Sequence, residues 1–498
     1  MNTLVPDNVT SAVHRLLIAA GVIATFMSSV NISIPNAALL HIQGSLSMSD
    51  DQVGWIFSSY IAASAIVMPM TRWLSGRFGR KAVFQVSIAL FALSLVLATL
   101  ATSPVPFIAA RILQGAASAT LAPISMAILL DELPPLRHGK LGIVWAVTAL
   151  SGILSGPAIG GYISEFFGWQ GIFLVSVPVA VLVCVAMALF LREKKAERRP
   201  TFDGFGFVTF SAGIAALQMF LDRGERLEWF LSTEIQVEAT VAVVGFYLYL
   251  VHVMTTEEHF LNRAMFKDRN FTISSTLHFV FGFVLLPTLA LTSPMLEELL
   301  GYPADTVGYL ALPRGASLIA ALLLTWRKPS FIDNRVVIVA GMALVVVGTW
   351  RMLGYSPLMD RWPVVVAGML QGAGLGVMMP ALTRAAFSTI TPTLRSEATT
   401  FYNMARLYGS TIGISIVQTY FYNNTQAMHL ALAANVRPYG PVADATGPLA
   451  GAHLALVNEL VTGQAALIAL IGQFKLLTIA MLVASPLALL LRKPPAIH

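Results

Sequence analysis

The sequence predicts an all-α integral membrane protein, and three observations lead to that prediction. Hydrophobic residues make up 56% of the 498 residues and charged residues only 11%, whereas a soluble domain carries roughly a quarter charged residues. The mean hydropathy is +0.74. Fourteen apolar runs are long enough to cross a bilayer, which takes about 20 residues per helix. This balance excludes a soluble enzyme and makes lipid the main solvent of the chain.

The predicted spans divide the chain into two six-helix blocks separated by an insert. We expect an N-terminal bundle in 1–191, a basic cytoplasmic linker in 192–203, two inserted membrane helices in 204–256 and a C-terminal bundle in 257–498 with a large outer loop at about 424–463. Two pseudo-repeated halves are typical of secondary transporters with a site at the bilayer midplane. The predicted spans are 14–36, 52–75, 82–101, 104–130, 141–164, 169–191, 204–221, 236–254, 271–295, 304–326, 335–354, 362–390, 397–423 and 464–491.

The positions of lysine and arginine predict the orientation of these spans. If the N-terminus is cytoplasmic, 22 of the 31 Lys and Arg residues fall in inner connections, four in outer connections and five within spans. Inner loops carry such an excess in membrane proteins. We therefore expect both termini in the cytoplasm. Because topology accounts for the basic clusters, the net charge of +6 does not indicate a nucleic-acid partner.

The sequence contains no motif for catalysis or for a cofactor. A Walker-type phosphate loop, H-E-x-x-H, C-x-x-C and G-x-S-x-G do not occur, so neither nucleotide binding nor a metal or nucleophile site is predicted. A single cysteine, Cys184, leaves no disulfide within the chain. We expect no enzyme activity, no cofactor and no metal site.

A glycine stripe in the fifth run is the first candidate functional motif, and it consists of Gly152, Gly156, Pro157, Gly160 and Gly161. Glycines spaced by four stack on one helix face, where another backbone can approach closely. Pro157 removes one helical hydrogen bond and permits a bend, which suits a gating helix. The alternative is tight packing without a gating role.

A second motif joins the second and third runs on the predicted inner side. It contains Arg77, Gly79, Arg80 and Lys81. As a charge cluster alone, it would serve as a topology anchor.

Arginines inside the spans form the third group of candidates. A guanidinium at membrane depth costs about 3 kcal/mol or more unless it faces protein or water, and Arg111, Arg314 and Arg406 all lie within predicted spans. Without an embedded acid they create a positive interior field, for which an anionic or weakly acidic amphipathic substrate would be the counter-ion. The alternative is that they bond to carbonyls or to polar neighbours such as Gln114, Gln371 and Asn403 and fix helices.

These motifs, in this order, resemble the major facilitator superfamily and specifically its fourteen-helix drug:proton antiporters of the EmrB/QacA type. Arg77 to Lys81 resembles the inner-loop motif of that superfamily, Arg111 to Gly115 its fourth-helix motif, and Gly152 to Gly161 the antiporter motif of exporters. Leu221 to Glu225, Phe266 to Phe271, Pro313 to Gly315 and Arg406 to Ser410 match further family segments.

The resemblance implies a fold of two six-helix bundles with two inserted helices in the bacterial inner membrane. It implies export of lipophilic small molecules by proton antiport and alternating access. In a double-membraned bacterium, the partners would be a periplasmic adaptor protein and an outer-membrane channel. Two alternatives remain: a specific metabolite transporter of the same superfamily, and a membrane receptor or scaffold that transports nothing.

The proton carrier is not identified by the resemblance. Asn31 stands where the first helix of the family often has an aspartate, and an asparagine cannot titrate. His278 in the ninth run could titrate near neutral pH. Asp222 and Glu225 are predicted at the outer end of the inserted pair and not at mid-membrane. The candidate residues of a central cavity are thus Asn31, Arg111, Gln114, His278, Arg314, Gln371, Asn403 and Arg406.

Overall fold

The computed structural model describes residues 7–132, 138–191, 193, 202–256, 263–327, 332–356, 358–391, 394–436 and 452–492, and within these ranges all regular structure is helical. The first block contains α1 (Asp7–Ser33), η1 (Ile34–Ala38), α2 (Leu39–Leu46), α3 (Asp50–Val53), α4 (Trp55–Val67), α5 (Met70–Phe78), α6 (Arg80–Leu100), α7 (Pro104–Glu132), α8 (His138–Phe167), α9 (Gly171–Leu174) and α10 (Ser176–Phe190). The insert contains α11 (Gly204–Arg223), η3 (Trp229–Leu231) and α12 (Thr233–Thr255). The last block contains η4 (Arg263–Lys267), α13 (Arg269–Pro294), η5 (Met295–Leu299), α14 (Ala304–Trp326), α15 (Asn334–Met352), α16 (Arg361–Phe387), α17 (Arg395–Ala433), α19 (Ala452–Ala484) and η7 (Ser485–Leu490).

Twelve helices in the described part of the chain are long and apolar enough to cross a membrane. The two remaining predicted spans have a different form. The span at 52–75 is divided into α4 and α5 at Met68 and Pro69, and its apolar part, Trp55–Val67, is short. The span at 397–423 lies within the 39-residue α17, which is the most polar of the long helices in its average composition. Whether the protein has fourteen membrane-spanning helices therefore depends on these two segments.

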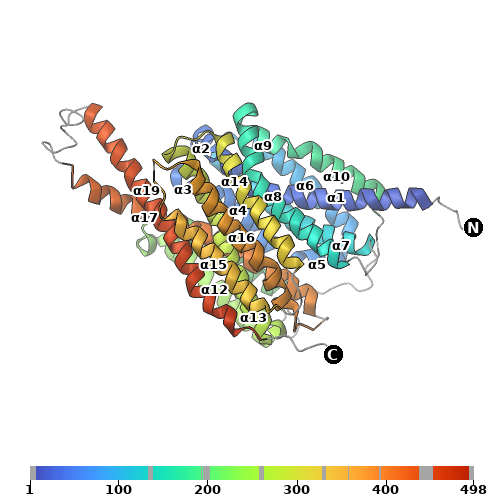
Figure 1. Ribbon diagram of the computed structural model, residues 1–498. Coiled ribbons are helices and arrows are strands. Elements are labelled where there is room, and N and C mark those ends of the chain that lie inside the picture. Colours follow the sequence, from blue (N-terminus) through green and yellow to red (C-terminus); the bar gives the residue numbers. More distant parts are fainter. Residues whose placement is uncertain are drawn as a thin grey trace, which may run out of the picture.

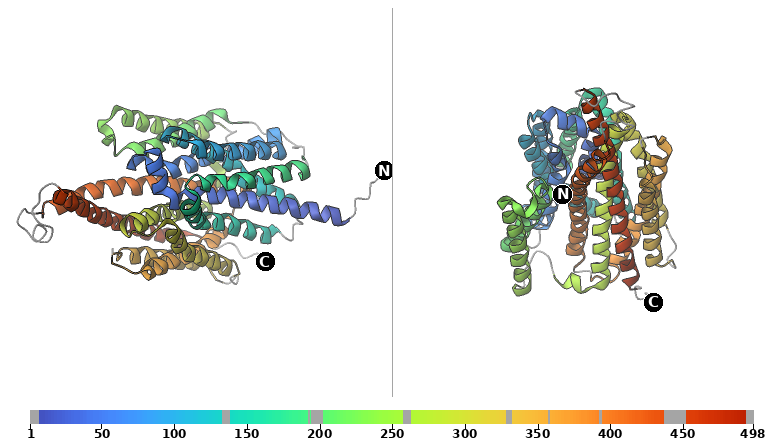
Figure 2. Two further views of the ribbon diagram at one scale, coloured as in Figure 1. Left: turned by 90° about the horizontal axis from the view of Figure 1, so that it is seen from above. Right: turned by 90° about the vertical axis from the view of Figure 1, so that its left-hand side faces the viewer.

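The large outer loop predicted at about 424–463 is shorter than expected. Helix α17 continues to Ala433 and α19 already begins at Ala452. The two helices project together beyond the rest of the bundle (Figures 1 and 2). These segments contain polar and small residues, from which the sequence predicts a loop. They are helical because α17 and α19 pack against each other. Residues 437–451, between α17 and α19 in the sequence, and most of the predicted linker, 192 and 194–201, lie outside the described residues.

The helices pack into two bundles that meet along two seams. Within the first bundle α1 contacts α7, α8 and α10, and within the second α16 contacts α13, α14 and α15. Contacts between bundles come mainly from α8 with α14 and from α4 with α17. Figure 1 shows α8, in blue-green, beside α14, in yellow.

The insert contacts both bundles through α11. Helix α11 contacts both α4 and α17, whereas α12 packs mainly on α11. The aromatic side chains of Phe210 and Tyr408 meet with ring centroids 6.0 Å apart, and Phe210 belongs to a small apolar cluster with Met404. Helix α11 therefore covers the seam between α4 and α17.

Local sequence signals place several helix starts. The carboxylates of Asp203, Asp268, Asp333 and Asp360 accept hydrogen bonds from backbone N–H groups at the starts of α11, α13, α15 and α16. Such caps satisfy donors that have no partner inside the helix. Between α5 and α6 the chain turns at Gly79, whose φ of +87° is readily adopted only by glycine.

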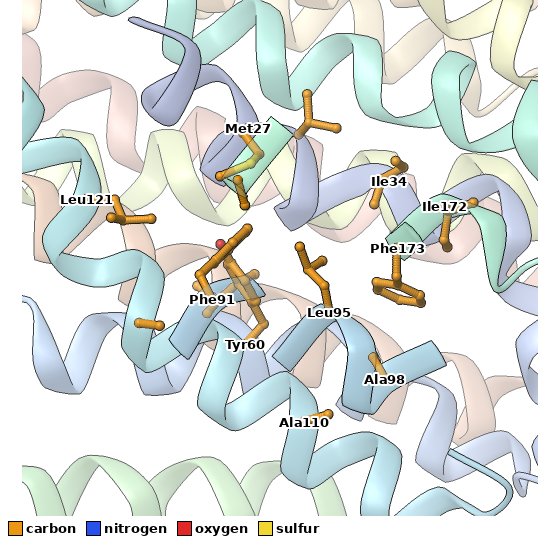
Figure 3. Packing of buried hydrophobic residues seen from close by; sticks show 14 of the residues in the cluster. Met27, Ile34, Tyr60, Phe91, Leu95, Ala98, Ala110, Leu121, Ile172 and Phe173 are labelled. Atoms are coloured by element: carbon orange, nitrogen blue, oxygen red, sulfur yellow. The ribbon is translucent and has the colours of Figure 1, made fainter. Parts of the chain in front are cut away.

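Each bundle has its own apolar core. In the first bundle, Phe91, Leu95 and Phe173 are fully buried, and Figure 3 shows them gathered with Tyr60 and Ile34 between helices. In the second bundle, another cluster forms around Phe281 and Phe474. Both clusters reach across the seams, because the first includes Leu289 of α13 and the second includes Leu150 of α8.

Candidate functional site

Arg111 lies at the centre of a polar network inside the first bundle. Its Nε donates to the carbonyl of Ile56 at 2.9 Å, and its Nη1 donates to the carbonyl of Asn31 at 3.1 Å and to Oε1 of Gln114 at 2.5 Å. The guanidinium carbon lies 4.5 Å above the ring of Tyr60. Arg111 has no exposed surface, so its contacts tie α1, α4 and α7 together.

Asn31 belongs to the same network. Its Oδ1 accepts from Nε2 of Gln114 at 3.0 Å, and its Nδ2 donates to the carbonyl of Met27 at 2.9 Å and to Ser176 at 3.2 Å. Asn31 and Gln114 are both fully buried. The amide thus joins α1 to α7 and α10, which is a role that a permanently neutral side chain can fill.

Arg314 is buried in the second bundle, with 5% of its surface exposed. Its Nη2 donates to the carbonyl of Leu285 at 3.0 Å. Nearby, Nε2 of Gln371 donates to Oγ1 of Thr288 at 2.9 Å. These bonds join α13 to α14 and to α16. For Arg111 and Arg314 the contacts fit the second interpretation of the sequence, in which buried arginines fix helices.

The remaining three predicted residues lie at the junction of α13 and α17. The ring of His278 stacks on that of Tyr402, with centroids 3.9 Å apart and 7° between planes, and His278 is 1% exposed. Asn403 donates to the carbonyl of Thr399 within its own helix at 3.0 Å. Arg406 is half-buried in α17. His278 is thus packed as an aromatic ring between the two helices.

The glycine stripe contacts both bundles. A Cβ on Gly152 would lie 2.7 Å from the carbonyl oxygen of Phe26, and a Cβ on Gly156 or Gly160 would collide with the end of α1 or with η1. A Cβ on Gly161 would strike the carbonyl oxygen of Ala304 in α14. Pro157 also packs at this seam, because a Cβ on Gly308 would lie 2.8 Å from its carbonyl oxygen. The stripe therefore permits close packing both inside the first bundle and across the α8–α14 seam.

The inner-loop motif lies at the turn between α5 and α6. Gly79 makes the turn, Lys81 donates to the carbonyl of Ala188 at 2.7 Å, Arg80 is half-buried and Arg77 is exposed. Close to this end of the molecule, Arg72 in α5 pairs with Glu397 in α17 at 2.5 Å. This ion pair joins the two bundles at the start of α17.

An open apolar cavity lies between the two bundles, and the space in it, counted together with the open solvent at its mouth, is about 950 Å³. Helices α2, α3 and α4 form the walls on one side, and α13, α17 and α19 form the walls on the other. Apolar side chains dominate, and polar groups come from three amides and one phenol. The lining includes Leu39, Phe57, Leu291, Ile414 and Leu470, and the polar members are Gln43, Gln418, Gln473 and Tyr422. Among the described residues that line this cavity, none is charged and none belongs to the eight predicted from the sequence.

A second, polar cavity adjoins the first, and the space in it, counted together with open solvent, is about 1160 Å³. The two share Gln418 and Tyr422 of α17 as a common wall. Asp222, at the end of α11, lines the polar cavity. One oxygen of its carboxylate accepts from Ser58 of α4 at 2.8 Å, and the other accepts from Gln218 at 2.9 Å and from Ser415 of α17.

Sequence reasoning missed both cavities. The partners of Asp222 lie 164 and 193 positions away in the chain, so no local pattern brings them together. One signal was present: Gln418 and Gln473 are amides within predominantly apolar helical sequence, where an uncharged polar side chain usually has a hydrogen-bonding purpose.

Comparison with known proteins identifies the family. The family model for the Major Facilitator Superfamily matches residues 21–414. The chain belongs to the Major Facilitator Superfamily. Its relatives include the multidrug export protein EmrB of Escherichia coli K12, which is 31% identical over 426 residues and covers 85% of this chain and 83% of EmrB. The fatty acid resistance protein FarB of Neisseria gonorrhoeae is 29% identical over 483 residues and covers 95% of both chains.

A solved structure confirms the superfamily fold. A bacterial homologue of the human lysosomal transporter Spinster, in an inward-facing and unoccupied conformation, aligns with a TM-score of 0.64 over 99% of this chain and 100% of that one, at 15% identity. The family predicted from the motifs is therefore confirmed. The protein is a multi-pass membrane transporter of this superfamily and not an enzyme.

Proposed function

We propose that this protein exports structurally varied lipophilic small molecules across the bacterial inner membrane by proton antiport, with alternating access between its two bundles. The observation that carries this proposal is the apolar cavity between the bundles. The names of the relatives EmrB and FarB, a multidrug export protein and a fatty acid resistance protein, support the same class of cargo.

The lining of the cavity supports selection by surface area and not by charge. A ligand gains roughly 25 cal/mol for each Å² of apolar surface that it buries. The amides of Gln43, Gln418 and Gln473 can each donate or accept a hydrogen bond, so they suit cargo with varied polar groups. The buried guanidinium of Arg314 is bonded to a backbone carbonyl and does not line the cavity. Lipophilic cations, anions and neutral molecules are therefore all expected as cargo.

An acidic lipophilic cargo is the more specific second candidate. The named resistance of the relative FarB favours it. Preference for one acidic compound with no competition by others would instead identify a specific metabolite transporter. Binding without flux under any gradient would identify a receptor or scaffold.

The topology and partners of this proposal follow from charge and shape. The excess of basic residues in one set of connections supports cytoplasmic termini. In that orientation the projecting end of α17 and α19 would lie on the periplasmic side. This pair carries exposed Leu430, Leu456 and Leu460. Exposed apolar side chains on a projecting hairpin suit a protein partner, and a periplasmic adaptor leading to an outer-membrane channel is the partner we propose.

A bulky residue in the cavity provides the test. Leu470 is 4% exposed and lines the cavity, whereas Leu482, on the same helix, is 50% exposed. We expect Leu470→Trp to weaken binding of a large lipophilic probe at least tenfold, and Leu482→Trp to leave it unchanged. Binding is measured by quenching of probe fluorescence on purified protein. Equal affinity of the two variants and the wild type would show that this cavity is not the cargo site.

A further inference from the structure

We propose that Asp222 is the proton-binding group that couples proton movement to the seam between α4 and α17. This inference rests on the proposed function, since it assigns the coupling residue of that same transport cycle. The feature that carries it is the position of one carboxylate between the two bundles.

The carboxylate of Asp222 is held from both sides of the seam. Ser58 belongs to α4 in the first bundle and Ser415 to α17 in the second, and both hydroxyls donate to Asp222. Gln218, one turn earlier in α11, donates to the carboxylate at 2.9 Å and to the hydroxyl of Ser415 at 2.7 Å. Asp222 is therefore a bridge through which α4, α11 and α17 are joined.

The chemistry of these partners permits both protonation states. All three are uncharged, and a serine hydroxyl can either donate or accept a hydrogen bond. The ionised carboxylate accepts from all three groups. A protonated carboxyl group can donate its own O–H to a serine oxygen if that hydroxyl rotates. Because hydrogen bonds to an ionised group are about twice as strong as those between neutral groups, proton binding weakens the bridge between α4 and α17 without leaving Asp222 unpaired.

A route to the group and a connection to cargo are both present. Asp222 is half-buried and lines the polar cavity, through which water and protons can reach it. Ser415, Gln418 and Tyr422 are spaced by three and four residues on α17, so they lie on one helix face. Gln418 also occupies the space over Gly54 at the start of α4, where a Cβ would collide with its amide. A shift of α17 thus changes both cavities together.

The surrounding charges do not replace Asp222 in this role. Arg223 pairs with Glu238 at 2.7 Å and with Glu234. Glu225 accepts hydrogen bonds from Trp229 and Asn423 and so bonds α17 but not α4. The other titratable and charged groups that face the polar cavity are Arg226, Glu228 and Tyr422. The groups that α4 and α17 direct toward Asp222 or this cavity also include the uncharged Ser58, Ser415 and Thr419.

The test uses full-length protein in proteoliposomes and three probes: tetraphenylphosphonium, laurate and N-phenylnaphthylamine. Asp222→Asn keeps the size and hydrogen-bonding capacity of the side chain but cannot titrate. We expect it to reduce probe-driven collapse of an imposed pH gradient at least tenfold, while probe exchange without a gradient stays within twofold of the wild type. Glu228→Gln, an exposed carboxyl on the same cavity, is the matched control and should keep coupled transport.

A second measurement covers the case in which Asp222→Asn inserts poorly. The affinity of purified protein for tetraphenylphosphonium is measured from pH 5 to 9. It should vary with pH in the wild type and in Asp222→Glu, with the transition at a different pH in Asp222→Glu. It should not vary with pH in Asp222→Asn. Wild-type gradient collapse or wild-type pH dependence in Asp222→Asn would overturn the assignment. A wild type that moves no protons with any probe would instead refute the proposed proton antiport.

Discussion

The α8–α14 seam gives the most quantitative prediction, because a single methyl group at Gly308 tests it. An alanine Cβ at this position would lie 2.7 Å from Cα of Ala158 and 2.8 Å from the carbonyl oxygen of Pro157. Ordinary contacts of a Cβ begin at about 3.4 Å, so the two backbones must separate by about 0.7 Å. Neither contact is with a side chain that could rotate away.

The expected cost follows from packing and helix propensity. Overpacking a close contact destabilises a protein by about 1–3 kcal/mol. Replacing a helical glycine by alanine stabilises the helix by up to about 1 kcal/mol. Gly308→Ala should therefore destabilise the packed seam by up to about 2 kcal/mol. Gly463 in α19 has no heavy atom within 4 Å of a Cβ, so Gly463→Ala should be neutral or slightly stabilising.

Thermal unfolding in detergent and initial transport rates measure the difference. We expect Gly308→Ala to unfold at a lower temperature than the wild type and to transport more slowly, and Gly463→Ala to match the wild type in both. If both variants unfold at the same temperature and transport at the same rate, the inference that α8 and α14 form a tight seam is wrong.

Three further variants test other parts of the structure. Gly156→Leu should abolish transport, because its side chain meets Ser33 and the backbone of η1; normal flux in membranes would remove the role of the stripe in gating. Arg111→Met should destabilise the first bundle by about 2–5 kcal/mol, since it leaves buried carbonyl and amide acceptors unpaired, and thermal unfolding identical to the wild type would contradict this. Arg314→Ala should reduce transport of lipophilic anions and cations equally, as expected if its role is to hold the carbonyl of Leu285; a selective loss for anions in competition assays would show that it faces cargo.

The sequence predicted the architecture well, because apolar length and glycine spacing are local properties. The stripe from Gly152 to Gly161 was expected to allow close helix contact, and its glycines do face other backbones. The end of helix α17 was harder to predict. Its polar C-terminal turns resemble a loop in sequence, and contact with α19 stabilises them as a helix.

The candidate site could not be predicted in the same way. Whether an arginine in a span faces cargo or a carbonyl depends on helices distant in sequence, and for Arg111 the decisive acceptors are at Ile56 and Asn31. Asp222 was recognised as an acid near a helix end, but its bridging position depends on Ser58 and Ser415. Such partners are set by the packing of the two bundles and the insert, which a single sequence does not display.

The central claim is that the protein exchanges protons for lipophilic molecules of different charge. The most direct measurement is the collapse of an imposed pH gradient in proteoliposomes on addition of tetraphenylphosphonium, laurate or N-phenylnaphthylamine, with protein-free vesicles as the control for protonophore activity. The account predicts protein-dependent collapse with more than one of the three. No protein-dependent collapse with any of them, despite measurable binding, would contradict it.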